Sequence, residues 1–222
     1  MDFIIRVCCS MVEIRNRIFN LFDYPVKYSI KGRGLDYSIC FSDVTQDEKD
    51  AIFETFADVY YGEGEGCLAE TLVSLLYNDG LVISFAESIT GGMISSALVG
   101  VSGCSDVFYE GVITYSNGSK IDRLKVGEDT LLEYGAVSAE TAIEMANGLL
   151  KDNVGLGVSC TGIAGPNGGS DLKPVGLVFI AVVSREITEC HRFVFEGPRN
   201  EIREKTKDQA LFLAIEHIKD NF

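Results

Sequence analysis

The sequence predicts an α/β protein in which a mixed-sheet domain with helices on both faces follows a small βαββα module. Helical and strand-like hydrophobic patterns alternate along the chain, as they do in α/β domains. The 222 residues are enough for one large domain, or for one ordinary domain and a small one. A glycine-rich acidic stretch over residues 61–66 interrupts the pattern and indicates a linker. We therefore expect the module over residues 1–66 and the larger domain over residues 67–222.

The βαββα module is predicted from alternation, helical periodicity and capping signals. A strand is expected near residues 3–7 and an amphipathic helix over residues 12–18. Two alternating strands, 26–30 and 37–41, are joined by the turn 31–34. A second helix begins near Thr45, because Thr45 and Glu48 have the spacing of a capping box.

The larger domain is predicted as a series of alternating helices and strands. Helices are expected over residues 67–77, 93–99, 119–124, 129–132, 138–151 and 200–219, and strands over residues 81–85, 111–115, 155–160, 175–183 and 189–195. The last two strands are close enough along the chain to form a hairpin. Apolar residues make up 46% of the chain, which is enough to build a core.

Composition and charge exclude several classes of protein. No apolar run approaches the length of a membrane span, and residues 1–6 lack the basic start of a secretion signal, so we expect a cytoplasmic protein with no membrane partner. The net charge of −14 and the lack of basic runs disfavour a nucleic-acid partner. Seven cysteines without paired spacing, and two histidines distant from them in sequence, predict free thiols rather than disulfides or a metal site.

Ser88 lies where a buried strand is predicted to turn into a helix that opens near Gly91. Small residues at such a turn let the backbone approach a ligand, and the unpaired N–H groups of a helix start attract negative charge. A hydroxyl there is within reach of donors that would stabilise an oxyanion. The alternative is that Ser88 or Thr90 simply caps the helix.

A second glycine-rich loop, residues 161–169, begins at the carboxyl end of the strand predicted over residues 155–160. The Ser88 turn has the same relation to its own strand. Because ligand crevices of α/β sheets lie at the carboxyl ends of strands, we expect both loops to border one crevice. The alternative is an ordinary long connection.

Two further segments carry basic residues that suit chemistry at this crevice. Lys120 follows the strand end at Tyr115, and burial would lower its pKa and let it act as a neutral base for a serine; otherwise it is a solvated helix residue. Arg199 and Arg203 share one helical face near a helix start, where cations are disfavoured, which suggests an anionic ligand. Ion pairs with Glu196 or Glu201 are the alternative.

These segments, taken in order, resemble the C-terminal domain of the CinA family, the nicotinamide mononucleotide (NMN) amidohydrolase or PncC domain. The resemblance spans about residues 67–222 and rests on motifs at residues 87–92, 115–120, 135–138, 161–176 and 197–203. Ile89 departs from the family, which usually has cysteine there. Residues 1–66 resemble the small KH-type module of long CinA proteins, but without a clear Gly-x-x-Gly loop, so RNA binding is not expected.

The resemblance implies hydrolysis of the NMN carboxamide to nicotinic acid mononucleotide and ammonia, without metal or cofactor. Ser88 would be the nucleophile, Lys120 the base, and Tyr115 a support for this dyad. The positions implied to hold the oxyanion, the ring or the phosphate are Thr90, Gly91, Gly92, Thr161, Gly162, and Arg199 or Arg203. A homo-oligomer is also implied. Two alternatives stay open: a non-catalytic nucleotide-binding regulator of the competence/damage-inducible type, and an amidohydrolase acting on another carboxamide.

Overall fold

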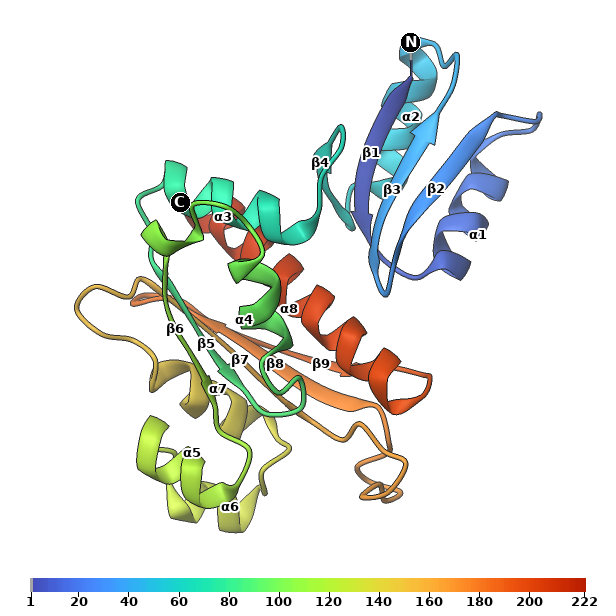
Figure 1. Ribbon diagram of the computed structural model, residues 1–222. Helices are drawn as coiled ribbons and strands as arrows, with labels where there is room; N and C mark the ends of the chain where they lie inside the picture. Colours follow the sequence, from blue (N-terminus) through green and yellow to red (C-terminus); the bar gives the residue numbers. More distant parts are fainter. Residues whose placement is uncertain (1) are drawn as a thin grey trace. The chain divides into compact units, whose positions relative to one another are not determined.

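The computed structural model describes residues 2–222, and the chain divides into two compact units, Met1–Thr71 and Leu72–Phe222 (Figure 1). The elements of the first unit are β1 (Phe3–Cys8), α1 (Met11–Leu21), β2 (Tyr28–Arg33), β3 (Asp36–Phe41), α2 (Gln46–Phe56) and β4 (Tyr60–Glu63). Helix α3 (Leu68–Asn78) begins in the first unit and continues into the second.

The first unit is an antiparallel sheet, in the order β2-β3-β1-β4, packed against two amphipathic helices. Inward-facing residues of β1 and β3 meet the buried faces of α1 and α2; among the fully buried ones are Ile5, Ile14, Ile39, Ile52 and Phe56. The predicted capping box is confirmed, since Thr45 and Glu48 exchange side chain–backbone hydrogen bonds at the start of α2. The two predicted helices and three predicted strands of the module are all present.

The linker predicted over residues 61–66 is wrong in part, because its first half forms strand β4, which pairs antiparallel with β1. Tyr61 is buried, and its hydroxyl hydrogen-bonds to Asp36. The guanidinium of Arg6 lies over the Tyr61 ring, 5.2 Å from its centroid, and leaves no space for a Cβ at Gly62. Gly62 permits this close packing within the sheet. In the sequence, a glycine with this role cannot be distinguished from a glycine in a flexible linker.

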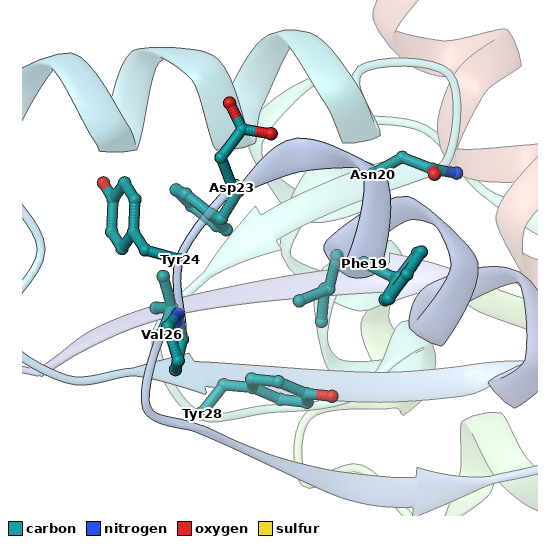
Figure 2. Close-up of a pocket in the computed structure, with 9 residues that line it drawn as sticks. Phe19, Asn20, Asp23, Tyr24, Val26 and Tyr28 are labelled. Carbon is teal, nitrogen blue, oxygen red and sulfur yellow. The ribbon is translucent and has the colours of Figure 1, made fainter.

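An apolar groove of about 730 Å³ lies on the first unit, between the end of α1 and the start of β2 (Figure 2). Its lining includes Phe19, Tyr24, Val26 and Tyr28, and Phe19 is 84% exposed. Among the described residues β2 is an edge strand, so no further strand of residues 2–222 closes the core on this side. The first unit therefore keeps part of its apolar surface open to solvent.

The second unit is a mixed five-stranded sheet with helices on both faces, as predicted. Its elements after α3 are β5 (Ile83–Glu87), α4 (Met93–Val99), a 3₁₀ turn (Cys104–Asp106), β6 (Phe108–Ile113), α5 (Asn117–Leu124), α6 (Glu128–Glu133), α7 (Ala139–Asn147), β7 (Leu156–Gly162), β8 (Leu177–Val183), β9 (Thr188–Val194) and α8 (Arg199–Asn221). The strand order is β6-β5-β7-β8-β9. Strand β5 runs parallel to both β6 and β7, whereas β8 is antiparallel to β7 and β9. No helix within residues 2–222 is both long and apolar enough to cross a membrane.

A hydrogen bond from β7 shows which helix covers one face of this sheet. The hydroxyl of Ser159 donates to the carbonyl of Ala142 in α7, so this face of β7 packs on α7. Figure 1 shows α5, α6 and α7 on that side and α4 and α8 on the other. Helices are needed on both faces of the sheet because β5, β7 and most of β8 are buried along their length. Since β5, β6 and β7 are mutually parallel, their carboxyl ends meet at one edge of the sheet.

Candidate active site

Ser88 and Lys120, which are 32 residues apart in sequence, meet at this edge of the sheet. Ser88 follows the last residue of β5, and its N–H donates to the carbonyl of Cys160 in β7 (3.1 Å), which fixes the turn. Beyond β6, the N–H of Thr114 donates to the carbonyl of Glu87 (2.9 Å), so the segment leading into α5 lies beside the Ser88 turn. The Nζ of Lys120 in α5 is 3.2 Å from the Oγ of Ser88.

Lys120 is a buried amine, not the solvated helix residue of the alternative interpretation. It is 1% exposed, and its Nζ donates to the carbonyls of Thr114 (2.7 Å) and Tyr115 (3.4 Å). Burial is the larger effect and lowers the pKa of Lys120, while the nearby Cys160 acts in the opposite direction. Within residues 2–222 no carboxylate pairs with it. A lysine in this setting gives up its proton more readily than an exposed one, as a general base must.

The amides at the start of α4 are held by Glu87, which was not among the site residues predicted from the sequence. The carboxylate of Glu87 is fully buried and accepts from the N–H groups of Gly92 (2.9 Å), Ile94 (3.0 Å) and Ser95 (2.8 Å). It also accepts from the Ser95 hydroxyl (2.6 Å). The expectation that the Gly92 amide faces a ligand is therefore wrong. The sequence feature that could have predicted this role of Glu87 is an acidic residue at the end of an apolar strand, just before a helix.

Neither Ser88 nor Thr90 caps α4, so that alternative is also wrong. The N-cap position is Gly92, in the left-handed region at φ 98°, which favours glycine. Thr90 is fully buried, and its hydroxyl lies 3.1 Å from the sulfur of Cys160. Burial raises the pKa of Cys160 to about 11, so this residue remains a neutral thiol at physiological pH. Thr90 thus supports the turn from within, and its side chain is not placed to contact a substrate.

We expect the change Glu87→Gln to destabilise the protein by about 1–3 kcal/mol, because an amide group places N–H donors against the backbone donors of α4. Urea unfolding of the full chain measures this loss. Glu140, an exposed acidic residue in the first turn of α7, supplies the matched control. The change Glu140→Gln is expected to stay within about 0.5 kcal/mol of the unchanged protein. Equal stability of the two variants would contradict the capping role of Glu87.

The second glycine-rich loop is fixed by hydrogen bonds at several points. The Nζ of Lys173 donates to the carbonyls of Tyr134 and Val137, each at 2.7 Å. The N–H of Gly176 donates to the carbonyl of Ile163 (2.7 Å), which closes the base of the loop. The loop is therefore held against the segment that precedes α7.

Thr161 and Gly162, at the end of β7, hold the two loops together. The Thr161 hydroxyl is buried and donates to the carbonyl of Ala136 (2.6 Å). A Cβ on Gly162 would lie 2.7 Å from the carbonyl oxygen of Leu177 and 2.9 Å from the Cδ1 of Ile89, so glycine is needed where β8 and Ile89 pack against the end of β7. Ile89 thus contributes an apolar contact between the Ser88 turn and β7.

Arg199 and Arg203 donate to uncharged oxygens, mostly backbone carbonyls, and not to acidic side chains. Arg199 donates to the Gly165 carbonyl (2.9 Å) and to the hydroxyl of Tyr115 (3.3 Å). Arg203 donates to the carbonyls of Ile89 (3.1 Å) and Thr90 (2.7 Å). In the described part of the chain neither arginine forms an ion pair, so the ion-pair alternative is wrong for both. Their positive charges therefore lie at the same edge of the sheet as Ser88.

Tyr115 contacts Lys120 through its backbone and Arg199 through its side chain. Its carbonyl accepts from the Nζ of Lys120, while the residue as a whole is 64% exposed and its hydroxyl accepts from Arg199. The predicted residues thus gather around two loops, with the Ser88–Lys120 pair on one side and the exposed Tyr115 and Arg199 on the other.

Comparison with known proteins gives a consistent relationship. The model of the CinA C-terminal domain matches residues 66–218. A CinA-like protein of Kosmotoga olearia is 48% identical over 161 residues, which are 72% of this chain and 39% of that protein. A putative competence-damage inducible protein of Caldicellulosiruptor saccharolyticus is 39% identical over 189 residues, covering 85% of this chain and 46% of its own length, so this match enters the first unit. The chain spans less than half the length of these curated relatives.

Solved structures agree with this relationship. The competence/damage inducible protein CihA of Agrobacterium tumefaciens superposes with a TM-score of 0.66 at 43% identity, covering 67% of this chain and 92% of that one. A CinA superfamily protein of Klebsiella pneumoniae superposes with a TM-score of 0.66 at 29% identity, covering 69% and 96%. The chain belongs to the CinA family, with its CinA C-terminal domain over residues 66–218.

Proposed function

We propose that the second unit is a serine amidohydrolase that converts NMN to nicotinic acid mononucleotide and ammonia. The observation that carries this proposal is the 3.2 Å approach of the buried Lys120 amine to the Ser88 hydroxyl. A serine alone is a weak nucleophile at neutral pH, and an adjacent neutral amine is one of the known ways to activate it. The resemblance to NMN amidohydrolases supplies the substrate.

In the proposed reaction Lys120, as a neutral amine, takes the proton of the Ser88 hydroxyl while Oγ forms a bond to the carboxamide carbon. The tetrahedral intermediate then breaks its C–N bond, and the lysine ammonium returns the proton to the leaving nitrogen, which departs as ammonia. Water attacks the resulting ester with Lys120 again as base, which releases the carboxylate and restores Ser88. The carbonyls of Thr114 and Tyr115 hold the lysine nitrogen in place through both steps.

The oxyanion donor is assigned to the amide of Gly91, a solvent-exposed residue. The neighbouring amides are less suitable, because that of Ser88 donates to Cys160 and that of Gly92 donates to Glu87. Gly91 lies three residues after the nucleophile on the same turn, and its φ of 61° suits a residue without a side chain. The second loop is assigned to positioning the ring, and Gly162 and the buried Thr161 hold the base of that loop in place.

The first unit is assigned to the KH-type module that precedes this domain in long CinA proteins. Its helices and strands follow the order βαββα before β4, and the match to the Caldicellulosiruptor protein extends into it. The acidic chain and the tight β2–β3 turn favour a role other than RNA binding. A cytoplasmic location, no membrane partner and self-association of the whole chain complete this proposal.

Ammonia release from NMN by the purified protein tests the activity directly. We expect turnover with NMN and production of nicotinic acid mononucleotide, followed by chromatography. A thermal shift with NMN, run in parallel, distinguishes the regulatory alternative. Stabilisation by NMN without any ammonia release would overturn the enzymatic proposal and favour a nucleotide-binding regulator. Turnover of other carboxamides but not of NMN would retain the mechanism and reject the substrate.

A further inference from the structure

We infer that the two arginines of α8 have different roles: Arg203 is a positioning residue for the Ser88 turn, and Arg199 is the residue that selects a phosphorylated substrate. This inference rests on the proposed amidohydrolase function. The two residues lie one helical turn apart, yet their hydrogen bonds lead to different loops.

Arg203 is committed to the turn that carries Ser88. Its Nε and one terminal nitrogen donate to the carbonyls of Ile89 (3.1 Å) and Thr90 (2.7 Å). Its other terminal nitrogen donates to the side-chain oxygen of Asn200 (3.2 Å). A guanidinium whose three nitrogens all donate to the protein is poorly placed to grip a phosphate as well.

Arg203 and Glu87 brace the turn from opposite ends. Glu87 accepts from amides at the start of α4, beginning with that of Gly92. Arg203 donates to the carbonyls of Thr90 and Ile89, which precede Gly92 by two and three residues. The carbonyls and amides of the turn are therefore held by charges of opposite sign. Charge-assisted hydrogen bonds of this kind are stronger than neutral ones, so the position of Ser88 depends on them.

Arg199 combines partial anchoring with exposure. It is the first residue of α8, it is solvent-exposed, and its two terminal nitrogens donate to the Gly165 carbonyl and the Tyr115 hydroxyl. Among residues 2–222 its Nε has no partner and no carboxylate neutralises its charge. A fixed, exposed and uncompensated guanidinium is suited to a phosphate monoester.

The hydrogen bonds of Tyr115 place Arg199 apart from the reacting groups. Arg199 joins the far end of the Tyr115 side chain, while the Tyr115 backbone contacts Lys120. One tyrosine side chain thus separates the charge from the reacting groups. In NMN, a ring and a ribose lie between the carboxamide and the phosphate, so the phosphate also lies apart from the reacting carbon. Arg199 is therefore assigned to the phosphate, and Tyr115 to the wall between the two ends.

The experiment compares NMN with nicotinamide riboside, which has the same carboxamide and lacks the phosphate. Arg199→Ala is expected to lower the ratio of kcat/KM for NMN to that for the riboside by roughly 10- to 100-fold, mainly through KM. Arg203→Ala is expected to leave that ratio within about twofold of its original value and to lower kcat for both substrates by roughly 10- to 100-fold. Arg203→Lys, which retains a donor, should recover part of the lost kcat.

Binding measurements keep this test separate from the test of the activity. Calorimetry on the Ser88→Ala variant gives the affinities for NMN and the riboside without turnover. Loss of the preference for NMN when Arg199→Ala is added supports the assignment even if the unchanged protein releases no ammonia. A preference for NMN lost with Arg203→Ala and retained with Arg199→Ala would overturn the inference. Equal binding of NMN and the riboside by the unchanged protein would overturn it too.

Discussion

Replacement of Ser88 by alanine is expected to reduce kcat for ammonia release from NMN by at least about 10³-fold. Removal of a nucleophile that acts as part of a unit leaves only the catalysis that binding and oxyanion donors provide. The Oγ of Ser88 accepts from Lys120, and no other chain element in the described residues holds it. The measurement is single-turnover ammonia release at saturating NMN.

The fold should survive this substitution, which makes the result interpretable. Ser88 is partly exposed, and its N–H bond to Cys160 does not involve the side chain. Ser96, an exposed serine in α4, gives a matched control. Ser96→Ala is expected to have the kcat and the urea midpoint of the unchanged protein. Undiminished turnover by Ser88→Ala would remove Ser88 from the mechanism.

Substitution of Lys120 is expected to have the second-largest effect, a loss of roughly 10²- to 10⁴-fold in kcat/KM for both Lys120→Met and Lys120→Arg. Methionine retains the length and apolar stem of lysine but has no basic nitrogen. Arginine retains the charge but does not deprotonate in proteins, so it is no general base. Lys125→Met, at the exposed end of the same helix, is the control and is expected to remain active.

The double variant Ser88→Ala with Lys120→Met distinguishes a dyad from two separate contributions. If the lysine acts only by activating the serine, the double variant is expected to be no less active than Ser88→Ala alone. Losses that multiply would show that Lys120 contributes to binding or to charge stabilisation by another route.

The pH dependence of kcat/KM should follow the deprotonation of Lys120. The base is active only when neutral, so the rate is expected to rise about tenfold per pH unit below the pKa of Lys120 and to level off above it. Because burial lowers the pKa of Lys120, this plateau begins at a lower pH than for an exposed lysine. A rate that falls as pH rises through the same range would contradict the role of a neutral amine.

Local signals in the sequence predicted most of the elements. The Thr45–Glu48 box set the start of α2, because capping depends only on neighbours along the chain. The apolar runs of β5 and β7 and the glycines after them predicted two loops at one sheet edge, because parallel strands place their carboxyl ends together. Strand β4 was missed since its pairing with β1 joins residues more than fifty positions apart. Helix α7 ends at Asn147, with Gly148 as its C-cap, earlier than the periodicity predicted.

By itself, the sequence determined the family and the residue types available at the candidate site: a serine at a strand-to-helix turn, a lysine after the next strand and two arginines on one helical face. Tertiary structure alone decided which donor meets which acceptor. In the folded chain Lys120 is buried beside Ser88, and the amides at the start of α4 donate to Glu87. Thr90 contacts the buried Cys160, and Arg199 and Arg203 donate to different loops. The physical reason is that periodicity and capping act over a few residues, whereas burial and hydrogen-bond partners depend on segments that meet only when the sheet forms.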